Sequence, residues 1–268
     1  MGWRSSLDIA YEIDVLNHLS SKEISIAKPI AKQDGQYITV LLAPEGERYA
    51  VLFTYAEGKE APYEDDVETK AFNYGKQAAK IHQATEDFSN SHSRFLLDMT
   101  DPFDAPLKKI SSMLSHRQKD WNYLQQLADK IRHRLARIPS QALEQGFCHG
   151  DFHGGNANFA DDGTITFYDF DCGGWGWRAY DISVFRWSAR LREKEMEYWQ
   201  PFIREYTAQK ALNELDLQTV PLFIGIRHFF LLDIHIGGGK DWGFGWMNDR
   251  YFDKAIAFFK AWETEYLS

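Results

Sequence analysis

The sequence predicts an α+β protein made of two unequal lobes. Apolar residues recur with helical spacing in most of the long segments, which indicates a largely helical chain. Two β-rich runs between residues 36 and 55 are separated by a short turn, which predicts a hairpin. A polar segment with glycine and proline, residues 56–62, follows it. We therefore expect a small lobe of residues 1–55 and a mostly helical large lobe of residues 56–268.

The small lobe is predicted to contain one helix and one β-hairpin. Between Ser6 and Leu19 apolar side chains recur every three residues, with acidic and amide side chains among them, as in an amphipathic helix. Residues 36–43 and 48–55 are rich in β-branched and aromatic side chains. The segment 44–47 between them contains proline and glycine and predicts the turn of the hairpin.

The large lobe is predicted to be helical except around one polar segment. Residues 67–85 and 106–137 have helical periodicity. Residues 146–171 predict two short strands, the second at 165–168, which flank loops rich in His, Asp and Asn. The remaining chain alternates helical stretches with one loop rich in glycine and tryptophan, residues 237–246.

The composition is that of a folded protein. Of the 268 residues, 44% are hydrophobic and 15% aromatic, which excludes disordered and collagen-like proteins. Two cysteines cannot form a disulfide framework, so a reducing cytoplasm is the expected compartment. The richest apolar run, residues 229–232, is far shorter than the ~18 residues of a membrane span. With 30 basic and 39 acidic residues the net charge is −9, which argues against nucleic acid and membranes as partners.

One loop and the strand after it carry the residue types of a phosphoryl-transfer site. Asp151 and Asn156 lie five residues apart in a polar loop, and Asp169 follows eighteen residues after Asp151, at the end of a strand. Phosphoryl transfer requires a carboxylate at the attacking hydroxyl and hard oxygen ligands that hold Mg²⁺ beside it. Protein-kinase catalytic loops place Asp and Asn at the same spacing and add a metal-binding Asp after a strand.

Three motifs follow one another in this region: His149–Asn156, Asp169-Phe170-Asp171 and Gly174–Asp181. Together they resemble the aminoglycoside phosphotransferase and choline kinase-like superfamily of small-molecule kinases. Upstream, Glu12–Leu19 is similar to the small-lobe helix of that family, and Gly75–His82 is similar to its helix after the hinge. The resemblance runs from the first helix to about residue 185. It implies a protein-kinase-like two-lobed fold with a truncated small lobe.

The resemblance also implies the chemistry of the site. Asp151 would be the catalytic base that acts on the acceptor hydroxyl. Asn156 and Asp169 would bind Mg²⁺, and Asp171 would contribute to a second metal ion. The phosphoryl donor would be ATP or GTP, and the acceptor a hydroxyl of a small metabolite or amino-sugar.

The same resemblance implies supporting roles around this centre. His149 and Asp181 would brace the backbone of the catalytic loop. Glu12 would pair with a lysine that positions the α- and β-phosphates. Backbone groups of the hinge would bind adenine, and the hinge residues are Phe53, Thr54, Tyr55 and Ala56.

The sequence departs from the family pattern before Glu12. In the resembled fold a glycine-rich loop and a lysine-bearing strand precede this helix, but only eleven residues precede Glu12. Three strands with short turns need roughly 25 residues. The run Gly237–Lys240 does not replace the loop, because Asp241 follows it where a Walker loop has Ser or Thr. A truncated product, a site completed by a second chain and a pseudo-kinase all fit; we favour truncation.

Two further expectations concern partners. The hairpin edge that missing strands would leave exposed favours a homodimer. Indole faces and carboxylates both attract amines, so a pocket for a cationic, hydroxylated acceptor is expected where tryptophan and aspartate gather. The candidate residues for this pocket are Trp175, Trp177, Trp242, Trp246 and Asp233.

Two other functions fit parts of the sequence. Without the glycine-rich loop and the lysine, the chain fits a non-catalytic ligand-binding protein of the same fold. His149, Asp151 and His153 together fit the metal site of a hydrolase, although further ligands would have to come from elsewhere.

Overall fold

The computed structural model describes residues 4–44, 46–60, 66–90, 92, 94, 97 and 102–267, and its chain forms two compact units. Unit 1 consists of Met1–Leu97 and Gln145–Leu212, and unit 2 consists of Asp98–Glu144 and Asn213–Ser268. Both helices and strands are present, as the α+β prediction requires. The lobe boundary predicted after residue 55 falls inside unit 1 and stays a prediction.

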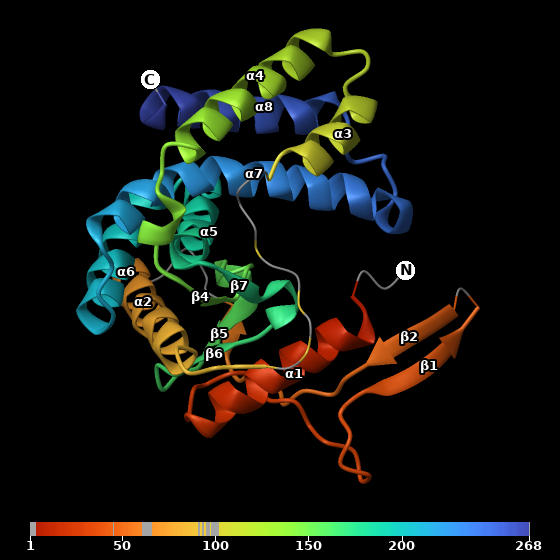
Figure 1. The fold of residues 1–268 in the computed structure, drawn as a ribbon, viewed down its shortest axis with the longest axis vertical. Coiled ribbons are helices and arrows are strands. Elements are labelled where there is room, and N and C mark those ends of the chain that lie inside the picture. Colours follow the sequence, from red (N-terminus) through yellow and green to blue (C-terminus); the bar gives the residue numbers. More distant parts are fainter. Residues whose placement is uncertain are drawn as a thin grey trace. The chain divides into compact units, whose positions relative to one another are not determined.

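The predicted hairpin is present in unit 1. Strand β1 (Thr39–Ala43) pairs antiparallel with β2 (Gly46–Ala50), and Leu41 lies opposite Arg48. The hairpin is shorter than predicted because β2 ends at Ala50, and the chain beyond it forms only an isolated bridge between Phe53 and Pro29. In Figure 1 the hairpin projects from the rest of unit 1.

Two small antiparallel sheets contain the strands in and around the polar segment 146–171. Strands β3 (Lys59–Glu60), β5 (Ala157–Phe159) and β6 (Ile165–Phe167) form one sheet in that order. Strands β4 (Gln145–Cys148) and β7 (Gly174–Trp177) form the other. The polar segment 56–62, where no strand was predicted, therefore contains a short strand, β3.

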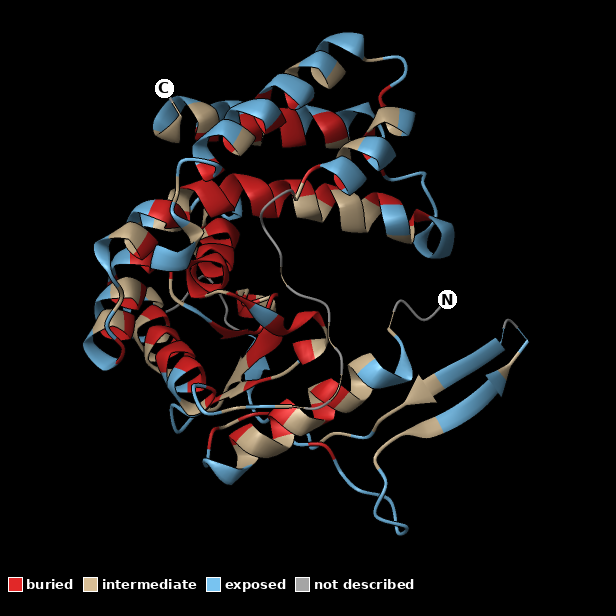
Figure 2. Ribbon diagram, viewed as in Figure 1, coloured by how far each residue is buried: buried red, intermediate tan, exposed pale blue. Residues whose placement is uncertain are grey.

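Four helices complete unit 1, and they are α1 (Ser6–Ser21), α2 (Val67–Ala84), α5 (Arg178–Leu191) and α6 (Glu195–Gln209). Helix α1 begins at a capping box, in which the Ser5 side chain accepts the Asp8 N–H at 3.2 Å and the Asp8 carboxylate accepts the Ser5 N–H at 2.9 Å. Helices α2 and α6 approach most closely at Gly75, where a Cβ would lie 2.2 Å from the Phe202 carbonyl oxygen. Helix α5 is almost entirely buried (Figure 2).

Unit 2 is helical, and its helices are α3 (Asp104–Met113), α4 (Gln118–Leu135), α7 (Glu214–Trp242) and α8 (Asp249–Tyr266). The helical region predicted over 106–137 is interrupted between α3 and α4. The prediction of a loop over 237–246 is wrong for its first part, because α7 continues to Trp242. Its glycines are needed for packing: a Cβ would lie 2.7 Å from the Trp242 ring at Gly238 and 2.2 Å from the Phe244 ring at Gly239.

Helix α7 is the one helix in the described part of the chain that is long and apolar enough to span a membrane. Within its most apolar window 61% is buried inside the protein, which is typical of a core helix. The Pro221 carbonyl in this helix accepts the Trp262 indole N–H at 2.8 Å, which ties α7 to α8.

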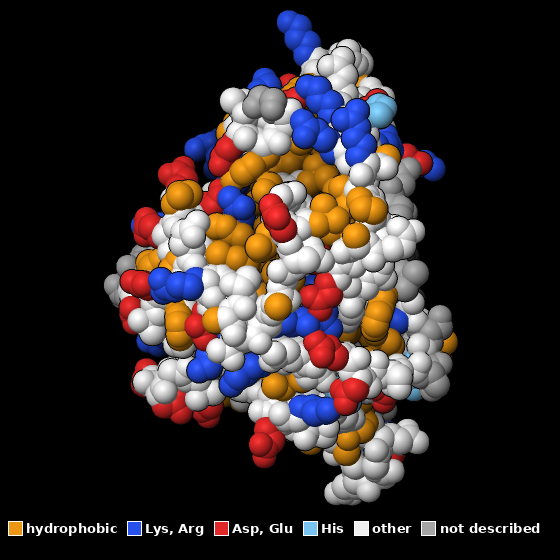
Figure 3. Space-filling view, turned by 60° about the vertical axis from the view of Figure 1, so that its left-hand side comes forward, with side chains coloured by type: hydrophobic (Ala, Val, Ile, Leu, Met, Phe, Trp, Pro, Cys, Tyr) orange, Lys and Arg blue, Asp and Glu red, His pale blue; other side chains and the backbone are white. Residues whose placement is uncertain are grey.

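Short 3₁₀ turns connect these elements, and they are Ser140–Ala142, Gly154–Asn156 and Phe170–Cys172. The last two occur in the loops that carry the predicted site. On the face of unit 1 seen in the lower part of Figure 3, acidic and basic side chains are interspersed.

Candidate active site

The predicted catalytic loop lies between strands that fix both of its ends. Strand β4 ends at Cys148, immediately before His149, and β5 begins at Ala157, immediately after Asn156. Strand β6 ends at Phe167, two residues before Asp169. Because β5 pairs with β6, with Ala157 opposite Phe167, the loop and Asp169 are held at the same end of one hairpin.

Asp151 and Asn156 are in direct contact within this loop. The Asn156 side-chain amide donates to the Asp151 backbone carbonyl at 2.9 Å and to its carboxylate Oδ2 at 3.1 Å. His153 Nε2 lies 3.3 Å from the same Oδ2. The Tyr74 hydroxyl donates to the His153 carbonyl at 3.1 Å, so helix α2 also holds the loop. The Asp151 carboxylate is therefore fixed in orientation.

Asp169 has a backbone conformation that is uncommon for residues other than glycine. Its φ is +63°, in the left-handed region that costs a non-glycine residue energy. Its pKa is raised to about 6, mainly because burial disfavours the charged form and further because Asp171 and Asp151 lie nearby. Strain and charge repulsion at one residue are typical of functional sites.

Glu12 joins the same group of acids. Its pKa is raised to about 7, first by burial, then by Asp171 and also by Asp169, whereas Arg94 and Arg4 lower it. Glu12 therefore interacts electrostatically with Asp171 and Asp169, and Asp169 interacts with Asp171 and Asp151; we call Glu12, Asp151, Asp169 and Asp171 the acid cluster. Such a concentration of negative charge favours a bound cation.

Asp181 connects helix α5 to the catalytic loop. Its carboxylate accepts the His149 N–H at 2.6 Å and the Gly150 N–H at 2.8 Å. His82 Nε2 lies 3.0 Å from Asp181 Oδ2, and His82 Nδ1 lies 2.7 Å from the Tyr206 hydroxyl. The loop backbone is thus held by a buried carboxylate that is itself held by helix α2.

His149 has both ring nitrogens engaged. Nε2 lies 3.0 Å from the Tyr168 carbonyl oxygen, to which it must donate, and Nδ1 accepts the Asp151 N–H at 3.3 Å. Burial lowers the pKa of His149, so the neutral ring is favoured. Neither nitrogen has a lone pair left for a metal ion, which argues against the hydrolase site that contains His149. In the described part of the chain, three or more His, Cys, Asp or Glu side chains do not form a ready metal-binding group.

The predicted hinge residues lie on an extended segment of unit 1. The Thr54 N–H donates to the Lys28 carbonyl at 2.8 Å, and the Ala56 carbonyl accepts the Asn158 side-chain amide at 2.8 Å. Phe53 forms a bridge with Pro29, and the Tyr55 side chain is exposed. The segment is therefore held on one side by residues 28–30.

The predicted acceptor residues fall in both units. In unit 1, Trp175 is exposed and donates its indole N–H to the Gln145 side chain at 3.3 Å, and Trp177 is half-buried at the end of β7. In unit 2, Trp242 is exposed on α7, and Asp233 forms an ion pair of 2.8 Å with Lys109.

Trp246 belongs to an aromatic group in unit 2. Its ring lies 4.9 Å from that of His235 and 5.2 Å from that of Tyr251, and His235 Nδ1 lies 2.7 Å from the Tyr251 hydroxyl. Burial lowers the pKa of His235, which favours its neutral form. This group offers aromatic faces of the kind that attract cations, although Arg227 also acts on His235.

Arg94 is a site residue that sequence reasoning missed. Its guanidinium contacts α1 and the segment after Asp169, and its side chain is only 3% exposed. Its acceptors are backbone carbonyls between 77 and 86 residues away in sequence, so no local motif marks it.

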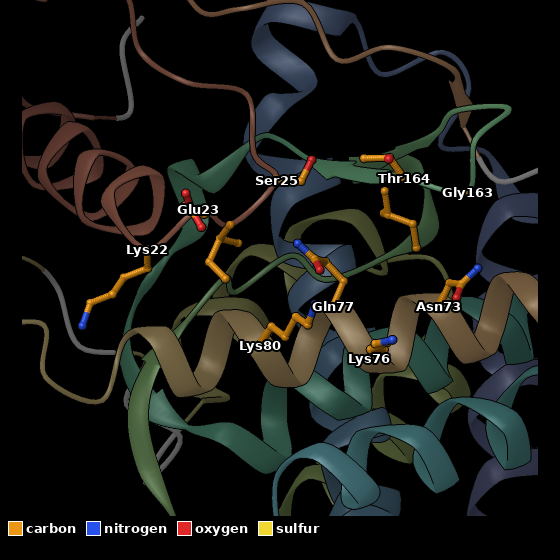
Figure 4. Close-up of a pocket in the computed structure, with 11 residues that line it drawn as sticks. Lys22, Glu23, Ser25, Asn73, Lys76, Gln77, Lys80, Gly163 and Thr164 are labelled. Carbon is orange, nitrogen blue, oxygen red and sulfur yellow. The ribbon is translucent and has the colours of Figure 1, made fainter.

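Unit 1 contains a cavity of about 540 Å³ (Figure 4). Side chains of α2 line one side, and the segments 22–25 and 163–165 line the other. Lys76 and Lys80 are the α2 cations of this cavity. No member of the acid cluster is among its described lining residues.

The model of the phosphotransferase enzyme family matches residues 2–215. The chain belongs to this family. The resemblance inferred from the three motifs is thereby confirmed, and the matched range includes both the catalytic loop and the segment after β6.

Relatives in this family include named kinases. The chain is 27% identical to the amicoumacin kinase of Bacillus subtilis over 241 residues, which cover 85% of this chain and 69% of that protein. It is 26% identical to the homoserine kinase of Agrobacterium fabrum over 227 residues, covering 80% and 64% of the two chains.

Solved structures of the family have the same fold. An amicoumacin kinase in complex with AMP-PNP and Ca²⁺ has a TM-score of 0.77 at 22% identity, covering 98% of this chain and 79% of that one. A microcompartment-associated aminopropanol kinase has a TM-score of 0.75 at 20% identity, covering 98% and 81%. The kinase-like fold predicted from the motifs is confirmed, and the chain is similar to small-molecule phosphotransferases.

Proposed function

We propose that this protein is a cytoplasmic, ATP- and Mg²⁺-dependent phosphotransferase that transfers the γ-phosphoryl group to a hydroxyl of a small amine-bearing molecule. The observation that carries the proposal is the contact of Asp151 with Asn156 inside the acid cluster. An oriented carboxylate beside clustered oxygen ligands is what phosphoryl transfer requires.

The ligand types of the acid cluster suit Mg²⁺, but the described side chains do not by themselves form a ready metal-binding group, so the ion would bind together with the nucleotide phosphates. The members of the cluster are carboxylates, and Asn156 uses its amide nitrogen to donate to Asp151, which leaves its carbonyl Oδ1 as a ligand atom. Asp169 and Asp171 would complete the protein ligands. A site with few protein ligands suits Mg²⁺, which keeps water and substrate phosphates in its shell. When bound, the ion would supply charge neutralisation at the transferring phosphoryl group.

Asp151 has the position required of the base. The acceptor hydroxyl would donate its proton to the Asp151 carboxylate while its oxygen bonds to the γ-phosphorus. The bond between that phosphorus and the β–γ bridging oxygen would break in line, and the nucleoside diphosphate would leave with the electron pair. Asn156 and His153 hold Oδ2, so the carboxylate meets the hydroxyl without reorientation.

The hinge backbone supports adenine binding. Leu52 and Thr54 direct their hydrogen bonds toward residues 28–30. In an extended chain successive residues alternate, so the Phe53 carbonyl and the Tyr55 N–H face the opposite side. Within the described residues no partner of these two groups is recorded. A donor and an acceptor two residues apart match one edge of a purine base, and ATP and GTP would be distinguished here.

The amine-bearing acceptor is inferred from the aromatic groups and from the relatives. The names of similar proteins include aminopropanol kinase and a choline/ethanolamine kinase family protein, whose named substrates are amino alcohols. Exposed indoles at Trp242 and Trp246 are suited to a cationic amine.

The test is nucleotide-dependent turnover of a panel of amino alcohols, amino acids and aminoglycosides. The full chain is assayed with Mg²⁺ and ATP or GTP, and the formation of nucleoside diphosphate is followed. Asp151→Asn should lower kcat by a factor of about 10² to 10⁴. Asp161→Asn, at an exposed aspartate in the turn after β5, is the matched control and should leave kcat unchanged. Equal rates for both variants would reject the base role.

A second candidate function is nucleotide binding without turnover. Among the main influences on the pKa of Glu12 in the described part of the chain, the cations are Arg94 and Arg4. A kinase of this type uses a lysine at the α- and β-phosphates. Micromolar binding of Mg²⁺–ATP by calorimetry, with no diphosphate formed from any acceptor, would favour this function.

A further inference from the structure

Arg94 is bonded to backbone carbonyls of two separate segments of unit 1. Its Nη1 donates to the Asp8 carbonyl at 2.9 Å. Its Nη2 donates to the Asp171 carbonyl at 2.5 Å and its Nε to the Gly173 carbonyl at 2.7 Å. The guanidinium also lies over the Tyr11 ring, 5.5 Å from its centre. A side chain that is only 3% exposed thus has well-defined partners on several sides.

These carbonyls belong to helix α1, which carries Glu12, and to the segment after β6, which carries Asp169 and Asp171. Asp8 precedes Glu12 by four residues in α1, so the two lie on the same face of the helix. Asp171 and Gly173 follow Asp169, which is held at positive φ. The guanidinium therefore joins the face of α1 that carries Glu12 to the loop that carries Asp169 and Asp171.

The geometry requires arginine in particular. A planar guanidinium presents several N–H groups in a fixed fork and can bond to two carbonyls of one turn and a third carbonyl of a helix. A lysine ammonium keeps the charge but lacks this fork. The positive charge of Arg94 also contributes, because it lowers the pKa of both Glu12 and Asp8. Arg94 thus opposes the repulsion that would separate the two segments.

We infer that Arg94 is a positioning residue whose guanidinium holds helix α1 against the loop after Asp169, so that Glu12, Asp169 and Asp171 stay together for a metal–nucleotide complex. The connection between the two segments is a property of the structure itself. Its use in binding Mg²⁺–nucleotide rests on the proposed function. The two parts are tested by separate measurements.

The connection is tested by amide hydrogen exchange on the full, metal-free chain. In Arg94→Gln the amides of Glu12 and Gly173 should exchange at least about tenfold faster, because each lost bond is charge-assisted. Amides of α6 should keep their protection. Lys76→Ala, which removes a cation of the cavity in Figure 4, should change neither amide. Faster exchange in only one of the two segments, or in neither, would overturn the inference.

The positioning role is tested by calorimetry of AMP-PNP binding in the presence of Mg²⁺. Arg94→Gln and Arg94→Lys should both weaken binding at least about tenfold, whereas Lys76→Ala should bind as the unaltered chain does. Arg94→Lys keeps the charge and provides a folded variant if Arg94→Gln unfolds. An unchanged Kd in Arg94→Lys together with a lowered Tm would show that Arg94 is only structural. If the unaltered chain binds no nucleotide, the proposed function fails, and hydrogen exchange still decides whether Arg94 joins the two segments.

Discussion

Asp169 and Glu12 hold their protons to higher pH than ordinary carboxyls because burial and neighbouring acids disfavour their charged forms. A carboxyl whose pKa is raised by folding binds its proton more tightly in the native state than in the unfolded chain. Stability is therefore lost as the pH rises from the unfolded pKa through the folded one. In this protein the loss occurs between about pH 4 and pH 7, the interval defined by the two raised pKa values.

The first prediction concerns Asp169→Asn. The amide carries no charge, so the variant should have a higher Tm than the unaltered chain above pH 6. The difference should shrink as the pH falls from 6 towards the ordinary carboxyl pKa of 3.8, because Asp169 then becomes protonated in the folded state and increasingly in the unfolded chain. Thermal unfolding at several pH values without metal checks this. Mg²⁺–nucleotide affinity should fall in the same variant, since a functional carboxylate is removed. A pH-independent difference in Tm would contradict the assignment.

A second prediction concerns Asp181, whose two oxygens accept backbone N–H groups of His149 and Gly150. In Asp181→Asn the side-chain NH₂ group would face the backbone N–H of His149 or Gly150, which leaves two donors without an acceptor. The carboxylate that His82 Nε2 contacts would also be lost. The free energy of unfolding should fall by about 3 kcal/mol, as when one partner of a buried pair is lost. Asp129→Asn, at an exposed pair with Arg132, should change it by less than about 1 kcal/mol. Denaturant titration of both variants measures the contrast.

Some residues of the candidate site belong to a recognisable sequence motif, and others do not. Asp151, Asn156 and Asp169 could be selected because their spacing reflects the β5–β6 hairpin, which the catalytic loop precedes and Asp169 follows. Their predicted roles remain to be tested. Arg94 could not be selected, because backbone carbonyls leave no trace in side-chain identity.

At the scale of elements, the catalytic loop depends on one glycine. Gly150 has a φ of +79°, and a Cβ there would lie 2.2 Å from the Cys172 carbonyl oxygen. Gly163, in the turn between β5 and β6, has a φ of +83° but nothing within 4 Å of a Cβ. A side chain at Gly163 would add backbone strain alone, whereas a side chain at Gly150 would add both backbone strain and steric overlap.

The third prediction uses this pair. Gly163→Ala should cost about 1 to 2 kcal/mol of unfolding free energy, the strain of a left-handed residue alone. Gly150→Ala should cost clearly more, because overlap of the loop with the segment after Asp169 is added, and turnover should fall with it. Denaturant titrations and kcat of both variants are the measurements. Equal costs would show that the loop relaxes around the new methyl group.

Elements with strong periodicity could be predicted, and elements defined by packing could not. The periodicity of residues 6–19 and 67–85 reflects faces buried in unit 1, and α1 and α2 follow it closely. Residues 237–242 are helical because aromatic rings pack against glycines, a tertiary effect that overrides the low helix propensity of glycine. Strand β3 depends on pairing with β5, almost a hundred residues away.

At the scale of the molecule, the β1–β2 hairpin is the most exposed apolar part of unit 1. Val40 and Leu41 are half-exposed, and Leu42 is 87% exposed. An edge strand with exposed apolar side chains favours pairing with another chain. The expected homodimer therefore has a specific surface on which to form.

The fourth prediction is that the protein dimerises through this hairpin. Light scattering across a concentration series should show a dimer that Leu42→Lys converts to a monomer, because an edge lysine opposes strand pairing. Leu191→Lys, at an exposed leucine ending α5, is the control and should leave the dimer intact. A monomer at every concentration of the unaltered chain would exclude this association.

The interleaving of the two units has a consequence for biosynthesis. Unit 1 uses residues up to Leu212, whereas unit 2 combines Asp98–Glu144 with Asn213–Ser268. During translation, the residues that make up unit 1, acid cluster included, have all emerged while α3 and α4 still lack α7 and α8. The apolar faces of α3 and α4 therefore remain exposed until α7 and α8 have been synthesised. A pause before residue 213 would prolong their exposure and increase the demand for chaperones.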